Sequence, residues 1–427
     1  MASKENIIAQ ETIEKATGKT ALVAEDLLWL GFIIYIASFV IASTDSVNYV
    51  VCNIFQILGI ALMLPSAVIL FNTKIENGYL RIVFFIYILW LLAAVIRGIK
   101  FDYEFLKLLL FDPNKGIFLY LVPLFILIPL TPTFLKKLFN TIVILGIIYL
   151  LYDLLFIKQL LYSGENLHSQ GLSEYFIQQL SLPCGFILLT FIYHTRKINL
   201  FALLIMGVSF LIAVIRARRG LIFISFSMLT FAWLIYQMTN KTRVINIVLS
   251  LFFITIIAYA AIGIYNQNRK ETFSLITERI SQRTRSQVEQ YFYRDMKTTD
   301  WIIGKGLAGE YFCPGVNEGE GKITVYRTVI ETGFLQIILN GGIISLSLFI
   351  LITLPAIIKG LFYSRNFLAK AAALWVVLLL LYLYPAAPVI FTLNYIIVWI
   401  SIAICYSEEI RKLSNDEMLE ILKAAKN

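Results

Sequence analysis

Apolar stretches about as long as a membrane is thick recur along the whole chain. A helix rises ~1.5 Å per residue, so roughly 20 apolar residues cross the ~30 Å hydrocarbon core. The pattern predicts about twelve membrane helices, over residues 27–43, 49–71, 80–97, 116–131, 140–160, 175–193, 199–215, 220–238, 244–265, 332–354, 368–384 and 387–405. The predicted fold class is therefore all-α, a polytopic membrane protein.

The predicted spans divide the chain into five segments. Residues 1–26 carry scattered charges and read as a cytoplasmic amphipathic lead-in, with too little apolar length for a cleavable signal peptide. Residues 27–265 hold nine spans, and residues 266–328 form one large extracytoplasmic loop. Residues 329–405 hold the last three spans, and residues 406–427 form a polar cytoplasmic tail.

The positions of lysine and arginine predict how the chain is oriented in the membrane, because short cytoplasmic loops between membrane helices carry an excess of both residues. The basic residues of one alternate set of connections are Lys74, Arg81, Lys136, Lys137, Arg196, Lys197, Lys241, Arg243, Lys359, Arg365 and Lys370. The opposite connections 44–48, 161–174 and 385–388 carry none. Both termini are therefore expected in the cytoplasm. The net charge of +9 mostly reflects these anchors and does not indicate nucleic-acid binding.

The turn Arg216-Ala217-Arg218-Arg219 breaks this charge rule. One straight helix over residues 200–238 would be about 58 Å long, so a tight hairpin is required here. By the orientation above, the hairpin lies at the outer face. Three outer arginines indicate a site for a lipid-linked phosphate or pyrophosphate, which guanidinium groups bind through paired hydrogen bonds. The alternative is that they contact lipid headgroups or loop carboxylates.

The large outer loop holds further candidates. Charged and apolar positions alternate over residues 269–297, which predicts one or two surface helices. Most arginines there have an acidic neighbour in the sequence, but Arg283 and Arg285 do not. These two are therefore the better candidates for contacting a substrate. A flexible stretch over 314–321 is a candidate lid.

Glycines follow at Gly304-Lys305-Gly306, where exposed backbone N–H groups suit a phosphate or a sugar. The stretch lacks the full P-loop pattern and no strand precedes it, so a nucleotide-binding P-loop is excluded. The alternative is a simple turn. Glu331 then stands at the mouth of a span with Arg327 one helical turn before it. This carboxylate is a candidate general base, or the two residues form an ion pair that fixes the helix end.

Cofactor chemistry has no candidate in the sequence. The only histidines are His168 and His194, and no spacing typical of metal ligands occurs, so neither a cofactor nor a metal is expected. Four cysteines are scattered along the chain. A disulfide between Cys52 and Cys313 is geometrically conceivable, but spacing alone does not support it.

These features resemble the O-antigen polymerase (Wzy) and O-antigen ligase superfamily of membrane glycosyltransferases. The resemblance rests on the span number, the large loop before the last three spans, Arg285, Gly304 and Gly306, and the run IETGFLQIILNGGIISL from Ile330. The arginine turn followed by Gly220 resembles the family's other outer arginine site. Ligase-like members place a histidine where this chain has Glu331, which favours polymerase over ligase.

The resemblance implies a class of substrate, a location in the membrane and roles for individual residues. The substrates would be undecaprenyl-pyrophosphate-linked oligosaccharides at the outer face of the bacterial cytoplasmic membrane, with membrane lipids and a chain-length regulator as partners. Arg219 and Arg285 would act in catalysis with Glu331. The substrate-binding residues would be Arg216, Arg218, Arg283, Arg327, Gly304, Lys305 and Gly306.

Two other functions stay open. A ligase that transfers glycan to a lipid or protein acceptor shares this chemistry and differs only in acceptor. A flippase for lipid-linked oligosaccharides is a different class, and transporters usually carry ionisable groups in mid-membrane and internal repeats. Here no clear repeat is visible, and Asp153 is the only acid inside a predicted span.

Overall fold

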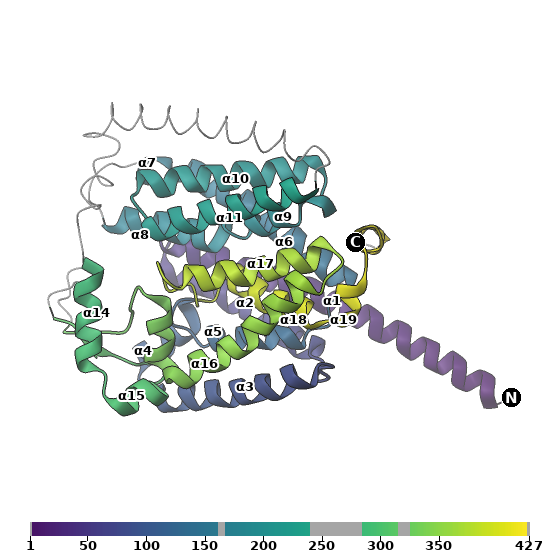
Figure 1. Cartoon of the computed structure of the whole chain (residues 1–427), viewed down its shortest axis with the longest axis horizontal. Coiled ribbons are helices and arrows are strands. Elements are labelled where there is room, and N and C mark those ends of the chain that lie inside the picture. Colours follow the sequence, from purple (N-terminus) through teal and green to yellow (C-terminus); the bar gives the residue numbers. More distant parts are fainter. Residues whose placement is uncertain (1, 161–166, 240–283, 315–324, 425–427) are drawn as a thin grey trace.

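The computed structural model describes residues 2–160, 167–239, 284–314 and 325–424, which form a bundle of helices packed side by side (Figure 1). Seven described helices are long and apolar enough to cross a membrane. The chain is therefore an all-α polytopic membrane protein, as the apolar pattern predicts. The seven helices are Thr20–Ala42, Tyr49–Leu70, Gly78–Gly98, Pro132–Leu155, Arg196–Ile215, Arg219–Thr239 and Gly333–Phe362.

The first half of the chain is entirely helical between its turns. Its elements are α1 (Ala2–Ala42), α2 (Tyr49–Leu70), α3 (Gly78–Gly98), α4 (Tyr103–Phe111), α5 (Phe118–Leu121), η1 (Val122–Leu127), α6 (Pro132–Leu155), α7 (Ile157–Leu160), α8 (Leu167–Phe176), η2 (Ile177–Ser181), α9 (Cys184–Leu189) and η3 (Phe191–Tyr193). Helix α1 runs without a break through residue 26, so the predicted lead-in and the first span are one helix.

Among the residues that the structure describes, the second half adds two short paired strands to the helices. Its elements are α10 (Arg196–Ile215), α11 (Arg219–Thr239), α14 (Thr284–Asp295), α15 (Thr298–Ile303), β1 (Tyr311–Phe312), β2 (Tyr326–Arg327), α16 (Gly333–Phe362), α17 (Phe367–Tyr382), α18 (Leu393–Tyr406), α19 (Glu408–Lys412) and α20 (Asn415–Ala424). β1 and β2 pair antiparallel, with Tyr311 opposite Arg327. The predicted span 244–265 lies outside the described residues.

Polar side chains fix where the long helices begin. Asn77 accepts a hydrogen bond from the backbone N–H of Leu80, and Thr131 and Thr195 do the same at the starts of α6 and α10. Such caps pair N–H groups that the first helical turn leaves without a partner. In a membrane helix the caps also mark the level at which the apolar segment begins.

Two predicted spans are broken in the structure. Residues 175–193 contain the end of α8, one turn of π-helix (η2), α9 and η3, with Pro183 between η2 and α9. Residues 116–131 contain only α5 and the 3-10 helix η1, with Pro123 near the start of η1. Both prolines lie at the start of a new helical segment, where the missing N–H of proline would have no helical partner anyway. Apolar length alone does not reveal such breaks.

The loops gather at two ends of the bundle. At one end Arg285 from α14 contacts Pro385, which follows α17, and Arg218 contacts Glu174 of α8. At the other end the backbone N–H of Arg365 donates to Arg411 (2.9 Å). Figure 1 shows the C-terminus and the start of α1 at this second end. The arginine turn therefore lies at the end of the bundle opposite the chain termini.

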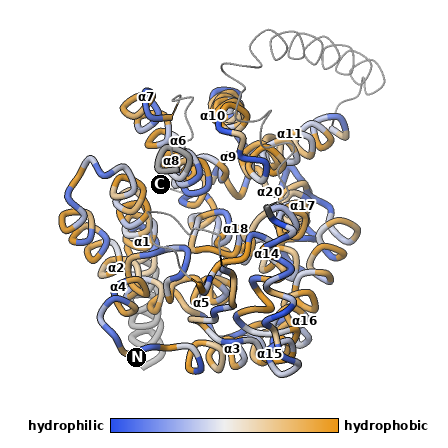
Figure 2. The backbone as a smooth tube through the Cα atoms, turned by 90° about the vertical axis from the view of Figure 1, so that its left-hand side faces the viewer, coloured by the Kyte–Doolittle hydropathy of each residue, from blue (hydrophilic) through white to orange (hydrophobic). Residues whose placement is uncertain are grey.

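The core is rich in aromatic rings. Trp399 of α18 is fully buried and stacks on Tyr87 of α3 at 5.6 Å between ring centroids, with Phe349 of α16 against its edge. The outer faces of α2 and α3 are apolar but exposed, as the orange helices of Figure 2 show. Large exposed apolar faces on helices of this length are typical of contact with lipid.

Candidate functional site

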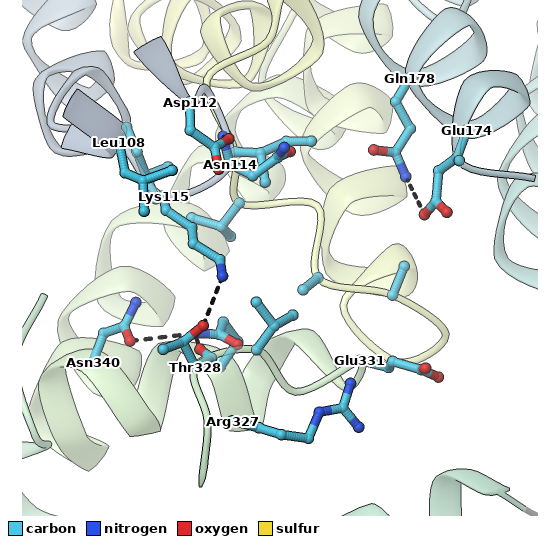
Figure 3. Close-up of a pocket in the computed structure, with 18 of the residues that line it drawn as sticks. Leu108, Asp112, Asn114, Lys115, Glu174, Gln178, Arg327, Thr328, Glu331 and Asn340 are labelled. Atoms are coloured by element: carbon cyan, nitrogen blue, oxygen red, sulfur yellow. Dashed lines mark hydrogen bonds between the residues drawn. The ribbon is translucent and has the colours of Figure 1, made fainter. Parts of the chain in front are cut away.

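A cavity of about 1280 Å³ lies at the end of the bundle that carries the arginine turn (Figure 3). Side chains from the α3–α4 and α4–α5 connections, α8, the α10–α11 turn, α14, the start of α16 and the loop after α17 line it. Its charged and amide lining residues are Lys100, Asp102, Glu104, Asp112, Asn114, Lys115, Glu174, Gln178, Arg218, Arg219, Arg285, Glu310, Arg327, Glu331, Gln336 and Asn340. Four of the arginines expected in the site therefore meet in one space.

The arginine turn is the tight hairpin that the sequence requires. Ala217 adopts a left-handed conformation (φ 51°), and the N–H of Arg218 donates back to the carbonyl oxygen of Ala213 (2.9 Å). The turn points its three arginines in different directions. Arg216 is fully buried and does not line the cavity, whereas the half-buried Arg218 and the exposed Arg219 do. Only two of the three can therefore contact a ligand there.

Arg218 is held by an acid from α8. Its Nη1 lies 3.0 Å from a carboxylate oxygen of Glu174, and Gln178, one turn further along the chain, donates to the same carboxylate (3.1 Å). The Glu174 carboxylate thus connects the arginine turn to α8 and to η2, which follows it. Because both residues line the cavity, an incoming anion can compete with Glu174 for the guanidinium.

Arg285 and Glu331 form the central ion pair of the site. Arg285 Nε lies 3.3 Å from Glu331 Oε2, and its Nη2 donates to the carbonyl oxygen of Pro385 (2.8 Å). Arg285 does have an acidic partner, but one 46 residues away in the sequence. Arg327 lies in β2 and Glu331 in the loop before α16, so the expected one-turn helical relation between them is wrong. Arg283 lies outside the described residues.

A second group of polar residues faces the first across the cavity. Lys115 donates through Nζ to Thr328 Oγ1 (2.8 Å), and the Asn340 amide donates to the Tyr120 hydroxyl (3.2 Å). Figure 3 shows Asp112 and Asn114 beside Lys115, on the wall away from Arg327. The Asp-Pro-Asn-Lys stretch between apolar segments is a turn signal that could have drawn attention to this loop.

Gly304, Lys305 and Gly306 do not line the cavity, and the structure gives them a packing role. Gly304 (φ 74°) and Gly306 (φ 85°) have left-handed backbone conformations. A Cβ on Gly304 would lie 2.5 Å from the backbone nitrogen of Gly341, and one on Gly306 would lie 2.8 Å from that of Gly98. The glycines therefore let α15 and the segment after it approach α16 and α3. Their N–H groups bind helix carbonyls, not phosphate.

Lys305 is the charged centre of a small cluster. Its ammonium group pairs with Asp295, lies 4.0 Å from Asp300 and donates to the carbonyl oxygen of Glu310 (3.0 Å). About a fifth of its side chain is exposed (21%). The cluster ties α14 and α15 to β1, and so supports Arg285 indirectly.

Replacing Lys305 with methionine should lower stability without removing ligand binding. Two partly buried carboxylates would lose their cation, at a cost of about 1–3 kcal/mol. The thermal unfolding midpoint of the detergent-purified protein measures this, with the exposed Lys297→Met as a control. An unchanged midpoint together with lost binding of pyrophosphate would instead place Lys305 in the binding site.

The described residues contain neither a disulfide nor a cluster of potential metal ligands. Cys52 and Cys313 are both free and buried, as are Cys184 and Cys405, so the disulfide is not formed. Within the described residues, no three potential metal ligands come together.

Comparison with known proteins leaves the function to be derived from the cavity itself. The chain matches no family model, no curated protein and no solved structure.

Proposed function

We propose that the protein polymerises oligosaccharide repeat units linked to undecaprenyl pyrophosphate, for an O-antigen, a capsule or an exopolysaccharide. The observation that carries this proposal is the convergence of Arg218, Arg219 and Arg285 on one cavity at an end of the membrane bundle. A large, charged cavity at that level suits a substrate with a polar head and a membrane-embedded tail. Such a donor is the substrate class implied by the family resemblance of the sequence.

The ion pairs of the cavity indicate which ligand its arginines suit. The carboxylates of Glu174 and Glu331 contact the guanidinium groups of Arg218 and Arg285. A carboxylate presents two oxygens to a guanidinium as a phosphate does, so these pairs mark positions that phosphate oxygens can take. A pyrophosphate carries more charge than either carboxylate. It can therefore bridge arginines that now have separate partners.

A small apolar crevice of about 30 Å³ adjoins the cavity. Leu182, Ile224, Met228, Leu378 and Leu379 line it together with residues of the loop after α17. The crevice shares lining residues with the cavity, among them Gln178 and Tyr382. In this proposal the polyprenyl chain stays in the membrane on the apolar side of the cavity, while its pyrophosphate lies among the arginines.

In the proposed reaction the arginines stabilise the charge that develops on the departing pyrophosphate. Fixed cationic donors are effective there because they need no reorganisation as the charge forms. The growing glycan passes from its own carrier lipid to a sugar hydroxyl of a new lipid-linked unit. Glu331 holds Arg285 in place through their ion pair. A nucleotide sugar has no role in this transfer.

The membrane arrangement that we propose follows the charge rule. Lysine-rich connections and both termini lie in the cytoplasm, and the cavity opens outside a bacterial cytoplasmic membrane. The twelve spans include the predicted one at 244–265. A chain-length regulator is the expected protein partner.

The experiment that tests this function is a gel of surface and lipid-linked glycans from the native host. It compares the wild type with a deletion strain, and with the deletion strain carrying either the wild-type gene or Arg219→Ala. The expected result is a ladder that collapses to a single repeat unit in the deletion strain and in the Arg219→Ala strain. The wild-type gene should restore the ladder.

Three other outcomes would overturn the proposal. An unchanged ladder in the deletion strain would show that another protein polymerises the glycan. Long glycan that accumulates on the carrier lipid but never reaches its final acceptor would indicate a ligase. Unpolymerised units trapped at the cytoplasmic face would indicate a flippase.

A further inference from the structure

Asp112 is one of the cavity carboxylates that lie outside the arginine ion pairs. Asp112 follows the last residue of α4, and its Oδ1 accepts a hydrogen bond from the backbone N–H of Asn114 (2.8 Å). Asp112 is half-buried and lines the cavity. The short turn thus holds the carboxylate at the cavity wall, where the Asn114 side chain and the backbone N–H of Lys115 also donate hydrogen bonds to it.

The surroundings of Asp112 are polar but poor in positive charge. Lys115 is the cation that acts on it, and the hydroxyls of Tyr35 from α1 and Tyr175 from α8 lie near enough to feel its charge. Lys115 itself donates to Thr328 (2.8 Å). Burial raises the pKa of Asp112 above its usual value, although the hydrogen bond from Asn114 and the charge of Lys115 act against this. A carboxylate in such a place is a stronger base than one in water.

The neighbouring wall is suited to sugar hydroxyls. Gln336 and Asn340, two residues one helical turn apart on α16, line the cavity with Asn114 and Thr328. Amide and hydroxyl groups both donate and accept hydrogen bonds, as hydroxyl recognition requires. The arginines Arg218, Arg219 and Arg285 come instead from the α10–α11 turn and α14. The cavity therefore has a cationic sector and an amide-rich sector.

We propose that the amide-rich sector binds the acceptor sugar, and that Asp112 is the catalytic base that takes the proton of its attacking hydroxyl. This inference rests on the proposed function, because it assigns the second substrate of the same cavity. The donor pyrophosphate occupies the cationic sector. The two substrates then meet between the sectors, where the anomeric carbon and the hydroxyl come together.

The transfer step balances with these groups alone. The acceptor hydroxyl oxygen forms a bond to the anomeric carbon, and the bond from that carbon to the pyrophosphate oxygen breaks. The electron pair of the broken bond stays on the pyrophosphate, where the arginines stabilise it. The hydroxyl proton moves to the Asp112 carboxylate, which returns it to water after product release.

Glu331, the base expected from the sequence, is less suited to this role in the structure. Its carboxylate contacts the Arg285 guanidinium, and about half of its side chain is exposed (52%). A base that stays paired with a cation and open to water would favour hydrolysis over transfer. Glu331 therefore acts as a positioning residue for Arg285.

The test uses the purified full-length protein in lipid nanodiscs and two measurements. Transfer is followed with lipid-linked units extracted from the deletion strain, and binding is followed with inorganic pyrophosphate. Asp112→Asn should lower the transfer rate about 100-fold or more. Its affinity for pyrophosphate should stay within a factor of two of the wild type, because the base does not contact the donor anion. Asparagine can keep the hydrogen bond to Asn114, so the turn should fold.

The pH profile distinguishes a base from a structural residue. Wild-type transfer should fall as the pH drops through the raised pKa of Asp112, since the base must be ionised to accept a proton. The residual activity of Asp112→Asn should lack this acid limb, and Asp112→Glu should restore part of the rate. Asp45→Asn, an exposed aspartate in the turn after α1, is the matched control and should behave as the wild type.

The outcomes separate this inference from the proposed function. If Asp112→Asn transfers at the wild-type rate while Glu331→Gln loses the acid limb, Glu331 is the base and the inference is wrong. If Asp112→Asn loses pyrophosphate binding as well, the residue belongs to the donor site, and the inference is again wrong. If Arg218→Ala and the wild type bind pyrophosphate equally and both elongate the glycan, the donor site is misplaced. If the wild type does not elongate the glycan at all, the proposed function itself fails.

Discussion

Replacing Arg285 with alanine should lower kcat/KM for glycan transfer by about 100- to 1000-fold. Arg285 contacts both Glu331 and the carbonyl oxygen of Pro385, so its guanidinium is fixed before any ligand arrives. A fixed cation stabilises a leaving pyrophosphate more than a mobile one does, because the ordering has already taken place on folding. Transfer assays with purified protein and lipid-linked units measure the loss.

The controls for Arg285 follow from its geometry. Arg285→Lys keeps the charge but loses the planar, paired donors, so it should recover only a small part of the rate. Arg294→Ala removes an exposed arginine from the same helix and should leave the rate unchanged. Wild-type rates in Arg285→Ala, with wild-type affinity for pyrophosphate, would remove Arg285 from the donor site.

Replacing Gly342 with alanine should prevent normal folding of the part of α16 that lies next to the cavity. Gly342 has a φ of 70°, and a Cβ there would lie 2.0 Å from the carbonyl oxygen of Ile302. The strained backbone and the overlap together should cost about 4 kcal/mol. Neighbouring contacts leave little room to adjust, because Trp90 donates to the Gly341 carbonyl oxygen (2.7 Å) and Arg97 to that of Ile303 (2.6 Å).

Size-exclusion profiles and thermal unfolding midpoints in detergent measure this effect. Gly207→Ala is the matched control, since Gly207 lies within α10 and a Cβ there meets nothing within 4 Å. Alanine is the better helix former, so this control should be neutral or slightly stabilising. A folded Gly342→Ala protein with a wild-type midpoint would show that α15 can move away from α16.

The apolar pattern of the sequence predicts most of the bundle because membrane helices need length and hydrophobicity more than specific contacts. All seven long helices of the structure coincide with predicted spans. The pattern fails where a helix is broken, as at Pro183 between η2 and α9. A π-helical turn keeps the same apolar residues, so hydropathy cannot distinguish it from a continuous span.

The site was harder to predict because its contacts join distant parts of the chain. The arginines at 218, 219, 285 and 327 are visible in the sequence and do line the cavity. In the sequence, Gly304 and Gly306 are compatible both with phosphate binding and with close packing of two backbones. The structure shows the second role, because the backbones of Gly341 and Gly98 lie against them. Asp112 was missed because a single aspartate beside a proline resembles any surface turn.

The burial of all four cysteines has a practical consequence for mapping the membrane orientation. Thiol reagents react only with sulfur that they can reach, so the unmodified chain provides its own unreactive background. A single new cysteine at Ser46, in the exposed turn after α1, or at Thr73, in the exposed connection between α2 and α3, would then be the only accessible thiol. A reagent that cannot cross lipid would report which of these two ends of the bundle faces the outside of a living cell.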